Sequence, residues 1–210
     1  MAEYEYTYIE HRIAGATSIE GTENYCYPNT TILRNKQGIK DDEALTVAER
    51  EISSLRILQL RSQPTEGNFD LDHLCQIHRF IFNDIYEWAG NLRHGEFLSK
   101  GGSIFCRGQF LKNNSDEIFA KLLNENQLRN LPKEQFVKRL AFYMGEVNAL
   151  HPFREGNGRT AREFFRQLSF AAGYTLDFGN THTDDLLKAD IDAFNGAYTG
   201  LVVILDKAVT

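Results

Sequence analysis

The chain has 210 residues, of which 42% are apolar and 25% charged, and its formal net charge is −6. These values are those of a folded globular domain and exclude a disordered chain. The negative balance disfavours nucleic acid as a direct partner, because phosphate binding needs a surplus of Lys and Arg. No stretch approaches the ~20 apolar residues that cross a bilayer, so no membrane partner is expected.

The three cysteines, Cys26, Cys75 and Cys106, are widely spaced. Zinc sites use CxxC pairs, and disulfide frameworks use a dense, even set of cysteines. We therefore expect three reduced thiols, with Cys106 in a structural role.

Residues 1–26 are rich in aromatic and turn residues, and an irregular N-terminal arm is expected there. From Asp42 to about Arg61 apolar residues recur every three or four positions, which predicts a helix capped by Asp41 or Asp42. The apolar positions of this helix, expected to face the core, are Leu45, Ala48, Ile52, Leu55 and Leu58.

A second helix is predicted from Asp70 until Ala89 and Gly90 end it. Its apolar face consists of Leu71, Leu74, Ile77, Ile81, Ile85 and Trp88. Two histidines of this helix, His73 and His78, are interpreted as solvated or packing groups rather than ligands.

Between Asn91 and Arg107 the periodicity fails, and two short runs flank a Ser-Lys-Gly-Gly turn, which predicts an exposed β-hairpin. The predicted fold class is therefore mostly α: a helical bundle with one β-hairpin. Further helices are predicted at about 108–126, 132–150 and 158–172, and from Thr183 towards the end with a weak point at Gly196 or Gly200.

The segment from His151 to Arg162 reads HPFREGNGRTAR and joins two predicted helices. Pro152 disfavours helix through His151, and Gly156 and Gly158 let the backbone turn tightly and approach a ligand. A loop that runs into a helix whose first amides are free is an anion site. This loop is suited to a polyphosphate.

Four side chains of the segment carry complementary chemistry. Arg159 and Arg162 lie three apart, so both can hold phosphate oxygens on one side of the helix. Glu155 offers a carboxylate to an ATP-bound Mg²⁺. His151 has the ordinary pKa of ~6.5 that suits proton transfer near neutrality.

The segment resembles the signature of the Fic family, HxFx(D/E)GNGRxxR, at every specified position from His151 to Arg162. The resemblance implies a protein adenylyltransferase of the Fic fold that moves AMP from Mg·ATP to a Tyr, Thr or Ser hydroxyl of a target protein. It implies that His151 takes the proton from the hydroxyl, that Phe153 anchors the loop and that Glu155 holds Mg²⁺. The implied ATP and phosphate ligands are Gly156, Asn157, Gly158, Arg159 for the β-phosphate and Arg162 for the γ-phosphate.

Two upstream segments extend the resemblance. Residues 85–93, IYEWAGNLR, are similar to the end of a family helix with the pattern YxWAGxxR, and residues 27–39 resemble toxin-type and Bartonella type IV secretion effector Fic domains. The hairpin is placed like the family's flap, which would hold a target segment by strand addition over the active-site loop. The implied flap residues are Ser99, Lys100, Gly101, Gly102, Ser103, Ile104 and Phe105.

Several alternatives remain open at this level. Lys100 is either a target contact or solvated, and Phe105 either clamps the target or covers the hairpin base. The chain is alternatively a Fic-fold transferase of another nucleotide or phosphate group, or an idle target-binding module. Gly158 disfavours the kinase variant, which has Lys there, and His151 with Glu155 disfavours the idle module.

Regulation and partners follow from the resemblance alone. The family's inhibitory pattern (S/T)xxxE(G/N) is matched imperfectly by residues 16–21, where Ala16 replaces the hydroxyl residue and Glu20 is the acid. A separate, small antitoxin-like protein is the favoured inhibitor. The expected target is a host GTPase or a bacterial topoisomerase, with secretion from the bacterial cytoplasm into the host cytosol or with residence in the bacterial cytoplasm only. The Fic domain is expected at 27–210, with a core at about 44–175 and C-terminal helices at 183–208.

Overall fold

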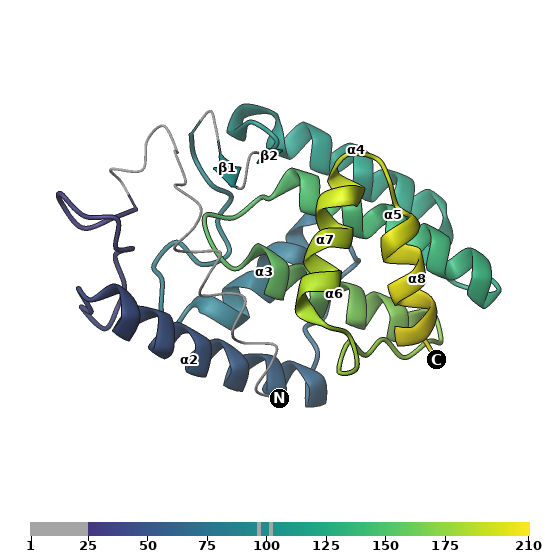
Figure 1. Cartoon of the computed structure of the whole chain (residues 1–210), viewed down its shortest axis with the longest axis horizontal. Helices are drawn as coiled ribbons and strands as arrows, with labels where there is room; N and C mark the ends of the chain where they lie inside the picture. The colour runs from purple at the N-terminus through teal and green to yellow at the C-terminus, as the bar shows by residue number, and fades with distance from the viewer. Residues whose placement is uncertain (1–24, 96–97, 101–102) are drawn as a thin grey trace.

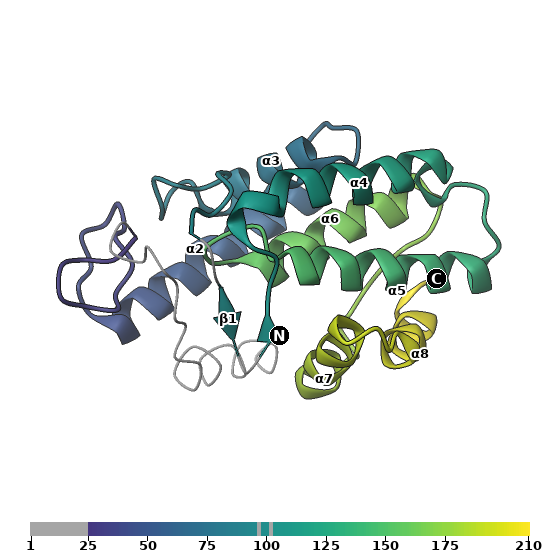
Figure 2. The ribbon, with the colours of Figure 1, turned by 90° about the horizontal axis from the view of Figure 1, so that it is seen from above.

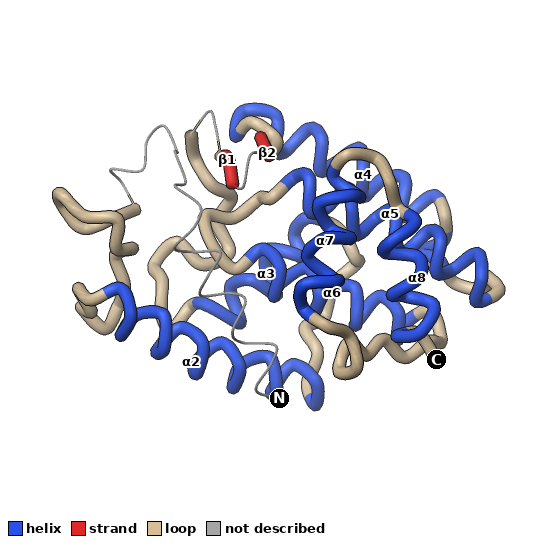
Figure 3. The backbone as a smooth tube through the Cα atoms, viewed as in Figure 1, coloured by secondary structure: helices blue, strands red, loops and turns tan. Residues whose placement is uncertain are grey.

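The structure is a computed structural model and describes residues 25–95, 98–100 and 103–210. Nearly all of the predicted N-terminal arm, including Glu20, lies outside these residues. The described part is mostly helical, as predicted, with two very short strands (Figure 3). Its α-helices are α2 (Asp42–Ser62), α3 (Leu71–Phe82), α4 (Leu111–Asn124), α5 (Lys133–Leu150), α6 (Asn157–Ala171), α7 (Thr183–Phe194) and α8 (Thr199–Ala208).

Helix α2 forms where the apolar spacing predicts it, but a different face is buried. The Asp41 side chain accepts a hydrogen bond from the Ala44 amide at 2.8 Å and so caps the helix. Leu55 and Leu58, expected in the core, are 63% and 62% exposed. The buried residues of α2 are Leu45, Thr46, Glu49, Ser53 and Leu60. The expected face is correct at Leu45 but wrong at Leu55 and Leu58, because the buried face includes polar residues that bind other segments of the chain.

Helix α3 is shorter than predicted, because it ends at Phe82 and not at Ala89. Ile85 and Tyr86 are fully buried in the turns that follow, so their apolar character reflects burial rather than helix. The segment before α2 packs against these turns, where the Lys36 amide donates to the Ile85 carbonyl at 2.8 Å. These turns therefore belong to the core although they are not helical.

The helices form a bundle around α5 and α6. Helix α5 packs on α4, α6, α7 and α8, and α3 packs on both α2 and α6 (Figures 1 and 2). The C-terminal pair α7 and α8 is broken at the predicted weak point, since Gly196 lies in the turn between them with a φ of +85°. No helix in the described part of the chain is long and apolar enough to span a membrane.

A short antiparallel strand pair lies where the hairpin was predicted. Strand β1 (Ser99–Lys100) pairs with β2 (Ser103–Ile104), with Ser99 opposite Ile104 and Lys100 opposite Ser103. Gly101 and Gly102 lie outside the described residues. At the base of the pair the Phe105 amide donates to the Leu98 carbonyl at 3.0 Å, and both side chains are buried. The function of this segment as a flap stays a prediction.

The corrected face of α2 can be tested with two neighbouring leucines. Leu60→Ala removes a fully buried side chain and should lower the free energy of unfolding by about 2–5 kcal/mol. Leu58→Ala removes an exposed side chain and should change it by less than about 0.5 kcal/mol. Urea denaturation of both variants measures the difference, and equal losses would contradict the assigned face.

Candidate active site

The loop after α5 begins with a left-handed residue. His151 has φ 46° and ψ 59° and ends the helix. The buried guanidinium of Arg93 holds this end, since its Nε donates to the His151 carbonyl at 2.8 Å and its Nη2 to the Leu150 carbonyl at 3.3 Å. The same Nη2 donates to the Cys106 carbonyl. A cation is favoured at these carbonyls, where the helix dipole is negative.

The imidazole of His151 is fixed by an aromatic contact. Its ring stacks on Phe105 with centroids 3.9 Å apart and planes 19° apart. Phe105 also meets Phe194 of α7 edge-on at 5.5 Å, and the Cys106 amide donates to the Ala149 carbonyl at 3.1 Å. Phe105 therefore packs at the base of the strand pair and links it to His151, and its contact with a target stays a prediction.

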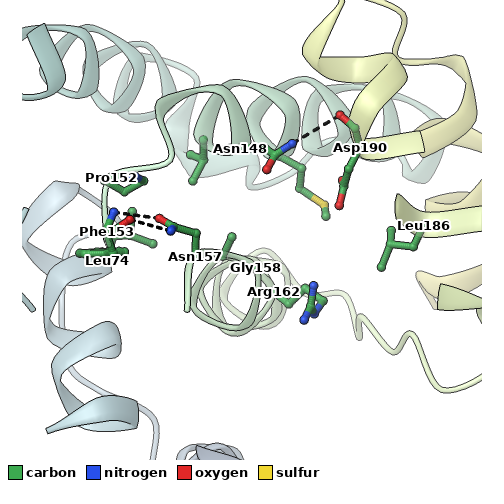
Figure 4. A pocket seen from close by; sticks show the side chains of 12 residues that line it. Leu74, Asn148, Pro152, Phe153, Asn157, Gly158, Arg162, Leu186 and Asp190 are labelled. Carbon is green, nitrogen blue, oxygen red and sulfur yellow. Dashed lines mark hydrogen bonds between the residues drawn. The ribbon is translucent and has the colours of Figure 1, made fainter. Parts of the chain in front are cut away.

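The loop is closed internally by Asn157. Its Oδ1 accepts from the Phe153 amide and its Nδ2 donates to the Phe153 carbonyl, both at 2.8 Å (Figure 4). Phe153 itself is 1% exposed, so it anchors the loop in the core as expected. The Asn157 side chain is thus occupied with the backbone of its own loop.

The buried His78 supports the loop from α3. Its Nδ1 accepts from the Gly90 amide at 2.8 Å, so the proton lies on Nε2, which donates to the Glu155 carbonyl at 3.0 Å. Its ring stacks on Phe153 with a centroid distance of 3.9 Å. Burial lowers the pKa of His78 to about 3, so the ring is neutral near pH 7. Of the two roles expected for His78, packing is the one found.

Gly156 joins the loop to α6 and leaves no room for a side chain. Its φ is +79°, and a Cβ there would lie 2.3 Å from the Phe82 ring. No side chain caps α6 at this end, and its first turn contains no acidic residue. The Glu155 Oε1 accepts from the Gly156 amide at 2.8 Å. Helix α6 thus begins with backbone amides close to the carboxylate of Glu155, an arrangement that is physically suited to an anion accompanied by a cation.

The two motif arginines point to different neighbours. Arg159 pairs with the buried Glu49 of α2, with Nη2 and Oε1 2.6 Å apart. Arg162 lies beside a cavity of about 30 Å³ between α5, α6 and α7, lined also by Gly158 and Asp190 (Figure 4). Burial raises the pKa of Asp190 to about 6 despite the opposing charge of Arg162. Both arginines therefore face carboxylates from other helices.

The structure brings the motif residues 151–162 together, and the pair β1 and β2 extends from the same region through Phe105. Sequence reasoning missed Glu49 and Asp190, and it gave Arg93 and His78 no part in supporting the loop. Nothing in the sequence distinguished Glu49 from the other charged residues of its helix, such as Arg50 and Glu51. Arg93 stands in the matched pattern YxWAGxxR, whereas nothing in the sequence marked Asp190.

The chain is similar in sequence to one known protein family. Residues 68–169 match the family model described as Fic/DOC family. The probable protein adenylyltransferase Fic of Salmonella typhimurium is 35% identical over 91% of this chain and 94% of its own length. The chain belongs to the Fic/DOC family. The predicted family is thereby confirmed.

Other proteins that this Fic chain resembles come from Bartonella species. The protein adenylyltransferase VbhT of Bartonella schoenbuchensis is 40% identical over 82% of this chain, but the match spans only 36% of VbhT. The Fic chain also resembles the solved structure of the translocated effector BepC from Bartonella tribocorum with bound AMPPNP, with a TM-score of 0.84 and 29% identity over 90% of this chain and 97% of that one. A Bartonella quintana Fic domain with bound ADP gives a TM-score of 0.85 and 28% identity over 89% of this chain and 94% of that one.

The space at Gly156 yields a prediction for the Fic motif. Gly156→Ala adds both left-handed strain and a clash with Phe82, whereas Gly173→Ala, at φ +93° with open space, adds strain alone. Thermal unfolding should show a loss of about 1 kcal/mol for Gly173→Ala and a clearly larger loss for Gly156→Ala. Similar losses would show that the Phe82 contact is not restrictive.

The buried His78 yields a pH prediction. Its folded pKa of about 3 lies below the ordinary 6.5, so only the unfolded chain binds a proton between these values. The free energy of unfolding should therefore fall with decreasing pH by about 1.4 kcal/mol per unit in this window. Asp190 has the opposite slope between 3.8 and about 6, because its folded pKa is raised.

The comparison is therefore made with His78→Gln, which keeps Asp190. Urea denaturation from pH 7 to pH 4 should show a shallower loss for the variant. Equal slopes for the two proteins would contradict a neutral, buried His78.

Proposed function

We propose that this chain is a protein adenylyltransferase that transfers AMP from Mg·ATP to a hydroxyl of a target protein and releases pyrophosphate. The chain is an enzyme of a family whose curated relatives bear that activity in their names. The single observation that carries the proposal is the start of α6, where the Gly156 amide binds the Glu155 carboxylate and Arg162 lines the adjoining cavity.

The nucleotide phosphates lie against the start of α6. The amides of Asn157, Gly158 and Arg159 are in the first helical turn, which contains no acidic residue, and the neighbouring carboxylate of Glu155 is the proposed ligand of the Mg²⁺ that accompanies the phosphates. Two solved relatives contain AMPPNP and ADP, which supports a nucleotide at this place. Arg159 serves the β-phosphate and Arg162 the γ-phosphate. Asn157 contributes by its amide and by shaping the loop, because its side chain binds Phe153.

His151 acts as the general base. It takes the proton from the target hydroxyl as the oxygen bonds to the α-phosphorus and the bond to the pyrophosphate oxygen breaks. The Arg93 guanidinium and the Phe105 ring fix the backbone and imidazole of His151, so the base is oriented before the target arrives. General-base action contributes about 10²–10⁴-fold to the rate.

Glu155 is the proposed Mg²⁺ ligand. Among the described residues no group of three or more His, Cys, Asp or Glu side chains can hold a metal by itself. Mg²⁺ commonly takes one or two carboxylates and otherwise phosphate and water, so this donor set fits an ion that arrives with the nucleotide. When bound there, the ion supplies positive charge against the phosphates.

The target docks on the strand pair and presents its hydroxyl to His151. Strands β1 and β2 supply the backbone edge for strand addition, and Phe105 connects this edge to His151. A host GTPase or a topoisomerase is the proposed target class. A separate inhibitory protein and delivery into a host cell are proposed from the kinship with effector Fic domains. The Fic domain is proposed to span 27–210.

The activity is tested by label transfer. The chain with Mg²⁺ and ATP labelled at the α-phosphate should label a protein in bacterial or mammalian lysate, whereas ATP labelled at the γ-phosphate should not. His151→Ala should reduce labelling by at least about 10²-fold. His182→Ala, which removes an exposed histidine outside the site, should leave labelling unchanged.

The opposite results have definite meanings. Label from the γ-phosphate would replace adenylyl transfer with phosphoryl transfer. Label from neither, with wild-type folding preserved by circular dichroism, would favour an idle binding module.

A further inference from the structure

Helix α2 turns a polar face towards the motif. Glu49 is 0% exposed and Ser53 is 1% exposed, although both lie in the middle of a 21-residue helix that buries few apolar side chains. A buried carboxylate is costly unless it is paired and hydrogen-bonded. The partner that offsets this cost is Arg159 of the motif, 110 residues further along the chain.

The contacts fix the guanidinium of Arg159 on two sides and one face. Nη2 donates to Glu49 Oε1 at 2.6 Å, and Nη1 donates to Ser53 Oγ at 2.8 Å. The Phe82 ring lies under the guanidinium at 4.7 Å from its centroid. Because a guanidinium is planar and rigid, these three contacts define its orientation.

Glu49 is itself held in place. Its second oxygen, Oε2, accepts a hydrogen bond from the Tyr86 hydroxyl, which is fully buried. Tyr86 in turn stacks on Trp88 with centroids 4.4 Å apart. The carboxylate therefore cannot follow a moving guanidinium, and it acts as a fixed anchor.

Arg159 occupies the first turn of α6, beside the amides that face the nucleotide phosphates in the proposed function. Its Nη2 also lies 3.9 Å from Glu155 Oε1, so the guanidinium lies between the buried carboxylate of α2 and the carboxylate of the loop. The side chain of Arg159 is only 14% exposed, and it has little freedom to adjust to a ligand. Its orientation must be set in advance.

We propose that Glu49 is a positioning residue, which holds Arg159 in the orientation that binds the β-phosphate and so makes α2 part of the nucleotide site. This inference rests on the proposed function of the motif. Ser53 supports the same orientation through Nη1. Glu49 does not touch the nucleotide; it acts through Arg159 alone.

The chain offers a matched control on α6. Glu163 is 3% exposed and binds Arg166 through both oxygens at 2.7 and 2.8 Å, so it is a second buried carboxylate with an arginine partner. Glu163 directly follows the motif, but its partner Arg166 lies outside the motif and further along α6. Glu163→Gln and Glu49→Gln therefore remove comparable charges, but only the second should affect the nucleotide.

The test measures the binding of ADP and AMP, each with Mg²⁺, by isothermal titration calorimetry. ADP has a β-phosphate and AMP has none. Glu49→Gln should therefore weaken ADP binding about ten-fold, which corresponds to the loss of one charge-assisted hydrogen bond between Arg159 and the β-phosphate. The same variant should leave AMP binding unchanged. Ser53→Ala should weaken ADP binding by a smaller factor in the same direction. Glu163→Gln should change neither nucleotide.

A double-mutant cycle links the effect to Arg159. Arg159→Lys should weaken ADP binding by itself, and adding Glu49→Gln to it should weaken binding little further. Additive losses would contradict the proposal, as would equal weakening of ADP and AMP, because equal weakening indicates general loosening of the site. If Glu49→Gln fails to fold, Ser53→Ala gives the same comparison.

The binding test is separable from the proposed activity. A wild-type chain that binds ADP more tightly than AMP but labels no protein would refute the proposed transferase activity. In that case the ADP binding of the Glu49→Gln and Ser53→Ala variants would still decide the role of Glu49. A wild-type chain that binds both nucleotides equally would overturn the positioning role, whatever its activity.

Discussion

The loop between α5 and α6 begins with a left-handed residue at His151, where this conformation is strained, and ends with another at Gly156, where glycine adopts it without strain. The rest of the site consists of contacts that hold this loop from behind. Arg93 binds the carbonyls at its start, His78 binds the Glu155 carbonyl in its middle, and Asn157 closes it. The amides at the start of α6 are thereby kept in one arrangement for an anion.

Most of the side chains that hold the loop are buried, although they are charged or polar. Each group loses its hydration on folding and is satisfied only when its partner is in place. Arg93, Glu49 and His78 come from three different segments, so the site forms only when the whole bundle has formed. A site preorganised in this way reorients little when charge develops in the reaction. The same contacts thus account for both the rigidity of the loop and the catalysis proposed for it.

The sequence predicted the helices and the motif loop well, because apolar spacing and glycine placement are local signals. It predicted the wrong face for α2, since Leu55 and Leu58 were weighed for their apolar character while Glu49 and Ser53 were not. It extended α3 past Phe82 because Ile85 continues the spacing although it is buried in a turn. The role of Glu49 depends on a partner 110 residues away, and periodicity within one helix does not carry that information.

The account is tested most directly at the backbone of the loop, by recording ¹H–¹⁵N NMR spectra of the chain with ADP and Mg²⁺. We expect the largest chemical shift changes at the amides of Asn157, Gly158 and Arg159, because these groups begin α6 and would face the phosphates in the proposed function. The side-chain signals of Asn157 should change little, since they remain bound to Phe153. Large changes elsewhere with unchanged amides at 157–159 would contradict the placement of the nucleotide.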